Sequence, residues 1–76
     1  MYKVKVMTND RLLNNLVICN SLTKQPRTYA SEEYATQEIM AVRYVCCMNG
    51  NQFVVVPQHS IFYITFERIE DDLPST

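Results

Sequence analysis

The chain has 76 residues, 47% of them hydrophobic and 20% charged, with a net charge of −1 at pH 7. This composition excludes an intrinsically disordered protein, and the length fits one domain whose core supplies at most about 3 to 5 kcal/mol. The longest apolar runs, such as 53–57, are far shorter than the roughly 20 residues of a membrane-spanning helix. We expect one soluble, β-rich domain over residues 1–69, followed by an acidic flexible tail over 70–76.

The cysteines predict a reducing, cytoplasmic location. Their number is odd, and the neighbours Cys46 and Cys47 have Cα atoms closer together than the about 4.4 to 6.8 Å typical of disulfides. A framework of structural disulfides is therefore not expected. Residues 1–6 alternate apolar and basic side chains, which differs from the continuous apolar region of a secretory signal.

Charge is distributed unevenly along the chain. Residues 1–31 carry five basic side chains and one acidic one, for a net charge of +4. Residues 32–76 carry seven acidic side chains and two basic ones, for a net charge of −5. This dipolar pattern fits head-to-tail pairing of two copies, a basic face for nucleic acid or a nucleotide, or scattered solvated charges.

Two strands are expected at the start of the chain. In residues 2–8, Tyr2, Val4 and Val6 alternate with Lys3 and Lys5, which predicts a half-buried strand with a basic outer face.

A turn at Asn9 and Asp10 leads to a second expected strand over 12–19. This strand places Leu16 and Ile18 on one face. The polar stretch 20–28, which contains Pro26, predicts a loop.

A short helix is expected over residues 32–40. Ser31 suits the N-cap, and Glu32 and Glu33 suit the positive end of a helix. Ala35 and Ile39 keep helical spacing, but a helix of under three turns requires packing on a sheet.

A β-hairpin is expected over 42–56. Asn49 and Gly50 suit the two central positions of a type I′ turn, where both residues need positive φ. That turn would place Cys46 opposite Phe53, Tyr44 opposite Val55 and Val45 opposite Val54. Pro57 should end the pairing, a turn over 58–60 should follow, and a last strand is expected over 61–69.

The predicted fold class is α+β and mostly β. The expected order is β-β-α-β-β-β, as a small five-stranded antiparallel sheet or barrel with one short helix. No Lys, Arg, Asp or Glu occurs in residues 44–66, and strands apolar on both faces need cover on both faces. We therefore expect either a closed barrel or a homo-oligomer with a strand of this segment at the interface.

The residue types argue against catalysis and cofactors. Phosphate-binding loops need several glycines, and Gly50 is the only one in the chain. Cys46 and Cys47 point to opposite faces of a strand, so no zinc site is expected with Cys19 and His59. The cysteines lack a neighbouring helix start or cation that would lower the thiol pKa, and we interpret them as packing residues. We expect no enzyme activity, cofactor or metal.

Tyrosines interleave with basic residues, a composition typical of protein interfaces and of sites that stack on bases. An alternative is that the tyrosines line a small core. The expected binding residues are Lys3, Lys5, Lys24, Arg27, Tyr29 and Tyr34. A nucleic acid or nucleotide would use the four basic residues together, whereas a protein partner would depend on a few anchors among Arg27, Tyr29 and Tyr34.

The segment Gly50–Pro57, followed by Ile61, Tyr63 and Ile64, resembles the closing two strands of Sm-like small β-barrels. The resemblance implies oligomerisation through edge strands and, by analogy with Sm-like rings, RNA binding. The chain differs in its mid-chain helix and in lacking a Lys-His pair near these strands, so no binding residue is carried over. In size and lack of motifs it is also similar to small phage-encoded inhibitors and anti-CRISPR proteins.

Two functional hypotheses follow. In the first, the protein is a non-enzymatic interaction domain that, like small phage-encoded inhibitors, binds and modulates or inhibits a macromolecular partner, which we expect to be a protein. In the second, it is an Sm-like oligomer that binds RNA or sequesters a small nucleotide.

Overall fold

The computed structural model describes residues 1–10, 13 and 15–69. The expected tail over 70–76 lies outside the described residues, as do Leu12 and Asn14 of the second predicted strand. No helix in the described part of the chain is long and apolar enough to cross a membrane. The elements follow the order β1 (Tyr2–Thr8), β2 (Leu16–Ile18), β3 (Thr28–Tyr29), α1 (Glu32–Met40), β4 (Tyr44–Asn49), β5 (Gln52–Pro57), the 3₁₀-helix η1 (Gln58–Ser60) and β6 (Ile61–Arg68).

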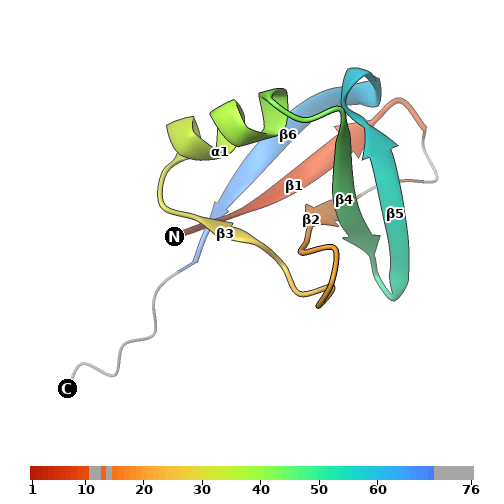
Figure 1. The fold of residues 1–76 in the computed structure, drawn as a ribbon, viewed down its shortest axis with the longest axis horizontal. Helices are drawn as coiled ribbons and strands as arrows, with labels where there is room; N and C mark the ends of the chain where they lie inside the picture. The colour runs from red at the N-terminus through yellow and green to blue at the C-terminus, as the bar shows by residue number, and fades with distance from the viewer. Residues whose placement is uncertain (11–12, 14, 70–76) are drawn as a thin grey trace.

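The strands form one six-stranded antiparallel sheet. Its order is β3-β1-β2-β4-β5, and β6 pairs with β1. The predicted mostly β, α+β fold is confirmed, but the sheet is open because β5 and β6 do not pair with each other. Figure 1 shows the β4–β5 hairpin and the β1–β6 pair crossing steeply in this view. Closure into a barrel therefore does not cover the uncharged segment 44–66.

Strand β1 is the centre of the sheet. It pairs with β6 from Tyr2 to Thr8, and on its other side with β3 and then β2. Residues 19–26, between β2 and β3, form a small hairpin in which an isolated antiparallel bridge pairs Cys19 with Pro26. The predicted loop over 20–28 is thus a hairpin followed by β3, a sixth strand of only two residues that propensity could not indicate.

The core lies on one face of the sheet. Val4 and Val6 are fully buried, while the alternating Lys3 and Lys5 are partly exposed, as the pattern predicts. Leu16 and Ile18 also face the core, so the predicted orientation of β2 is confirmed. The strand is shorter than expected and begins at Leu16.

Helix α1 begins and ends where the sequence predicts. The Ser31 side chain accepts a hydrogen bond from the Tyr34 amide over 3.1 Å, which satisfies one free N–H of the first turn. Ala35 and Ile39 are buried in the core cluster. The helix therefore covers the core and carries its acidic first turn toward solvent.

The β4–β5 hairpin has a different register from the predicted one. Asn49 pairs with Gln52, so Gly50 and Asn51 form the turn. Gly50 has a φ of 64°, whereas Asn51 is not among the described residues with positive φ. This combination fits a type II′ turn, which takes glycine at its first central position. The three predicted cross-strand pairs are wrong: the observed pairs are Tyr44 with Pro57, Val45 with Val56 and Cys46 with Val55.

Candidate functional site

The six predicted binding residues fall into two groups. Lys3 and Lys24 line one shallow cavity on the face opposite the core, and Lys5 lies next to Lys3 along the same side of β1. Arg27, Tyr29 and Tyr34 gather instead near Glu38 of α1. The structure therefore does not combine the six residues into a single site.

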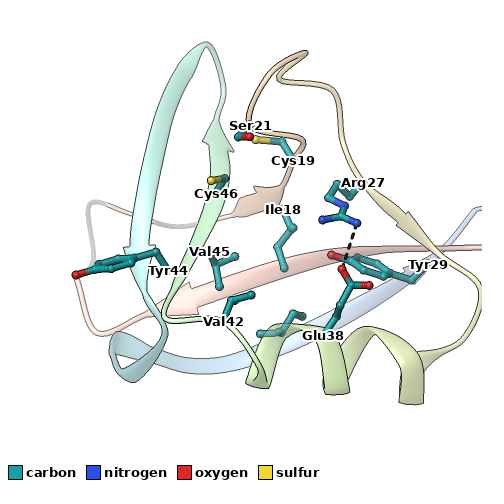
Figure 2. Close-up of a pocket in the computed structure, with 11 residues that line it drawn as sticks. Ile18, Cys19, Ser21, Arg27, Tyr29, Glu38, Val42, Tyr44, Val45 and Cys46 are labelled. Atoms are coloured by element: carbon teal, nitrogen blue, oxygen red, sulfur yellow. Dashed lines mark ion pairs between the residues drawn. The ribbon is translucent and has the colours of Figure 1, made fainter.

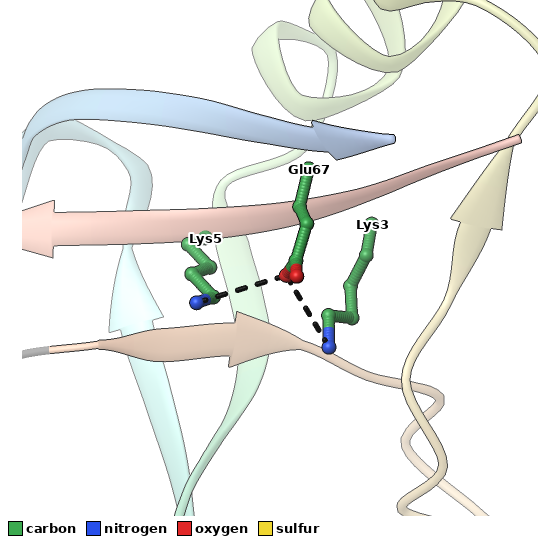
Figure 3. Close-up of polar contacts among 3 residues, drawn as sticks. All are labelled: Lys3, Lys5 and Glu67. Atoms are coloured by element: carbon green, nitrogen blue, oxygen red, sulfur yellow. Dashed lines mark ion pairs between the residues drawn. The ribbon is translucent and has the colours of Figure 1, made fainter. Parts of the chain in front are cut away.

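Lys3 and Lys5 share one carboxylate. Their ammonium groups lie 3.5 Å and 3.7 Å from Oε1 of Glu67, which sits opposite Lys3 on β6 (Figure 3). All three side chains are partly exposed, so each ion pair contributes at most about 1 kcal/mol. The shared carboxylate nevertheless offsets part of the positive charge that a polyanion would meet here.

Lys24 is held by the hairpin that contains it. Its ammonium donates a hydrogen bond to the Ser21 carbonyl and lies 4.3 Å from the centre of the Phe53 ring. This arrangement is a cation–π contact, which contributes about 0.5 to 1 kcal/mol at an exposed position. Lys24 thereby joins the 19–26 hairpin to the start of β5.

Arg27 joins β3 to the helix. Its guanidinium lies 3.2 Å from Oε1 of Glu38 and 5.5 Å from the centre of the Tyr29 ring (Figure 2). Tyr29 is only 3% exposed and belongs to the core cluster, while the Tyr34 ring lies 6.3 Å from it and is exposed. Tyr29 thus has a structural position, which leaves Arg27 and Tyr34 as the accessible members of this group.

The tyrosines of this group have altered acidity. Burial raises the pKa of the Tyr29 phenol above its usual value, and the nearby Arg27 partly opposes the change. A hydrogen bond to Glu38, together with its negative charge, raises the pKa of Tyr34. Both phenols therefore remain neutral at physiological pH.

A small cavity of ≈ 130 Å³ lies between the 19–26 hairpin, α1 and the start of β4. Arg27 and Glu38 form its polar wall, and the side chains of Cys19 and Cys46 lie at its other end (Figure 2). This volume accommodates water molecules or a single side chain, but not a nucleotide. The described residues also contain no group of three or more His, Cys, Asp or Glu positioned to hold a metal ion.

Among the described residues, no strand pairs with the outer edge of β5. The Cys19 amide donates to the Cys46 carbonyl over 2.9 Å, so the main-chain groups of Cys46 point toward β2. Along an antiparallel strand, the direction of these main-chain groups alternates from one residue to the next. The main-chain groups of Cys47 therefore point toward β5, where Cys47 pairs with Val54. By the same alternation the N–H and C=O groups of Phe53 and Val55 point away from β4. These two residues offer two donors and two acceptors to a further strand.

The side chains along this edge are apolar and accessible. Phe53 is 37% exposed and Val55 49% exposed, and Tyr44 of β4 is exposed on the same face. A groove of ≈ 290 Å³ separates 54–57 from the residues that follow β1, among them Asn9 and Leu13. Unlike most free edge strands, β5 contains no charged residue that would discourage pairing with another chain.

Phe53 and Val55 were not among the predicted binding residues. The available signal was the uncharged segment 44–66, which indicated an interface without identifying the strand edge that would provide it. The edge depends on which strands pair, and this information is not local in sequence.

No protein-family model matches this chain, and no curated protein or solved structure matches it significantly. The Sm-like resemblance of residues 50–64 therefore stays an expectation. Function is inferred from the chemistry of the site itself.

Proposed function

We propose that this chain is a non-enzymatic binding domain that recruits an extended segment of a protein partner to the free edge of β5 and thereby modulates that partner. The observation that carries the proposal is the uncharged β5 edge, where the backbone groups of Phe53 and Val55 point away from the sheet. Strand addition uses main-chain hydrogen bonds for affinity and alternate side chains for specificity.

The surface around this edge has the composition of an interface. Tyr44, Phe53 and Val55 share one face, and exposed aromatic side chains of this kind supply most of the energy in many protein interfaces. Partner residues that pack beside Phe53 would also contact the aliphatic part of Lys24. The partner segment that fits best is therefore extended, apolar and without acidic or basic side chains opposite 53–55.

The charge arrangement favours a protein over a nucleic acid. Lys3 and Lys5 lie against Glu67, and Arg27 lies against Glu38, so three of the four predicted basic residues face a carboxylate. Polyanion binding gains most from basic groups that are free to neutralise phosphates. The sequence pI of ≈ 5.7 points in the same direction.

Replacing Val55 by proline tests the edge. The substitution removes an outward N–H, and proline is tolerated on edge strands whose N–H faces solvent. We expect the affinity for the partner captured from the native cell to fall about tenfold or more, with thermal unfolding unchanged at concentrations where both proteins are monomeric. Titration calorimetry with the purified partner would measure this change.

Arg68→Pro is the matched control. The Ile69 amide donates to the Met1 carbonyl, so by alternation the Arg68 N–H points away from β1, along the opposite edge of the sheet. This variant should bind normally. Equal affinities of Val55→Pro and the unchanged chain would contradict the proposal. Capture of an RNA would also contradict the proposal if replacing Lys3, Lys5, Lys24 or Arg27 weakened RNA binding by similar amounts and reduced its dependence on salt.

We also expect the free chain to self-associate through the same edge. Two copies of 53–55 are complementary when antiparallel, because each Phe53 can exchange two hydrogen bonds with Val55 of the other copy. Light scattering at micromolar concentration should give a mass above 8.9 kDa, and Val55→Pro should return it to that value. If the unchanged chain and Val55→Pro are both monomers, the chain does not self-associate through this edge, and the binding test with the partner still stands.

A further inference from the structure

The register of β2 and β4 places two thiols opposite each other. Ile18 pairs with Cys47, so the next pair along the strands is Cys19 with Cys46, and the Cys19 amide donates to the Cys46 carbonyl over 2.9 Å. Hydrogen-bonded antiparallel pairs have Cα atoms about 5.5 Å apart. That separation lies inside the Cα range of about 4.4 to 6.8 Å that disulfides occupy. To form the bond, the two Cβ atoms must approach to about 3.5 to 4.5 Å, which is closer than in an average strand pair, so the two strands must move slightly together.

The two side chains also share a face. Ile18 and Cys47 point into the core, so Cys19 and Cys46 point to the opposite side of the sheet. Cys19 lines the shallow cavity on that opposite face together with Met48, which lies two residues from Cys46 along β4, and Figure 2 shows Cys46 on β4 and Cys19 just after β2. Cys46 is half-buried and Cys19 is buried outside the core cluster, whereas Cys47 is fully buried within it.

We propose that Cys19 and Cys46 are a dithiol modification site that a low-molecular-weight disulfide oxidises to a reversible cross-strand disulfide. The thiolate of Cys46, the more accessible of the two, attacks one sulfur of the reagent, and one thiolate of the reagent leaves. The Cys19 thiol then loses its proton, attacks the Cys46 sulfur and expels the second half of the reagent. Two protein thiols are oxidised, and one reagent disulfide is reduced to two thiols.

The bond would reinforce the existing pairing of β2 with β4. It would join the 19–26 hairpin to β4 and enclose β3 and α1 in a covalent loop. Cross-links of this kind restrict the unfolded chain and so stabilise the folded one. Burial raises the pKa of the Cys19 thiol, so the second step should accelerate as the pH rises toward 9.0, the ordinary value for cysteine.

Treatment of the full chain with excess glutathione disulfide tests the site. We expect the intact mass to fall by two hydrogen atoms, and a tryptic digest without reductant to link peptide 12–24 to peptide 44–68. Thermal unfolding should shift upward by about 10 °C or more, and dithiothreitol should reverse the shift.

Variants identify the second thiol. Cys46 and Cys47 lie in the same tryptic peptide, so the digest alone does not show which of them is linked to Cys19. The Cys47→Ala variant should therefore still form the link. Cys46→Ala, at a half-buried position where folding should be retained, should abolish the link, and Cys19→Ala should do the same. A link that persists in Cys46→Ala, disulfide-bonded dimers, or glutathione adducts without a link would each overturn the proposal.

Discussion

A Leu16→Ala variant should lose about 2 to 5 kcal/mol of the free energy of unfolding. Leu16 is fully buried, and its short strand joins β1 to β4 at the middle of the sheet. Alanine would leave a cavity in the core cluster, where Leu16 lies with buried residues of β1, α1, β4 and β5. A core of this size supplies only about 3 to 5 kcal/mol, so the variant should be close to unfolding. Urea denaturation would measure the loss.

Leu22→Ala is the matched control for this prediction. The same atoms are deleted, but Leu22 is 87% exposed in the 19–26 hairpin. We expect a change within about 0.5 kcal/mol. Similar losses at the two leucines would mean that β2 does not hold the sheet together in solution.

A second large effect should appear at alkaline pH through Cys47. Burial raises the pKa of its thiol from 9.0 to about 12 in the folded chain. Below pH 9 the thiol is protonated in both the folded and unfolded states, so it has no effect on stability there. As the pH rises from 9 toward 12, the unfolded chain loses this proton first, and the folded chain becomes less stable. The loss approaches about 4 kcal/mol for a shift of this size.

Cys47→Val should remove this dependence, because it keeps a small apolar side chain and has no proton to lose. Urea denaturation at several pH values above 9 should give a shallower decline for the variant. Cys19 and Tyr29, whose pKa values burial also raises, leave some decline in both proteins. Val56→Ala serves as control, since it weakens the same core without changing a titrating group. An equally steep decline in Cys47→Val would show that this thiol does not govern alkaline unfolding.

Several local features could be predicted because each depends on a few neighbouring residues. Ser31 and the two glutamates after it fix the start of α1. The alternation of Val4 and Val6 with lysines fixes which face of β1 is buried. In both cases the decisive interaction spans at most four residues.

The register of the β4–β5 hairpin could not be predicted from the same kind of pattern. The predicted and observed registers differ by two residues, and such a slip keeps every side chain on its original face. Hydrophobic alternation therefore fits both. The turn decides between the two registers. Gly50, with its positive φ, occupies the first central position of the observed turn and Asn51 the second, instead of Asn49 and Gly50.

The candidate site required tertiary information throughout. Sequence composition indicated six binding residues, but their distances to carboxylates on β6 and α1 decide how much charge remains available. The binding edge at Phe53 and Val55 exists only because β5 pairs on one side, and the facing thiols exist only because β2 lies against β4.

The fold class, the limits of the helix, the existence of the β4–β5 hairpin and the buried faces of β1 and β2 could all be predicted from local patterns in the sequence. These follow from capping, turn chemistry and alternation, which act over short distances along the chain. Only the pairing of distant strands shows that the sheet is open, that β3 forms, and which backbone groups of β5 point away from its partner strand. The physical reason is that strand pairing joins residues far apart in sequence, and no local pattern specifies which distant strand completes each edge.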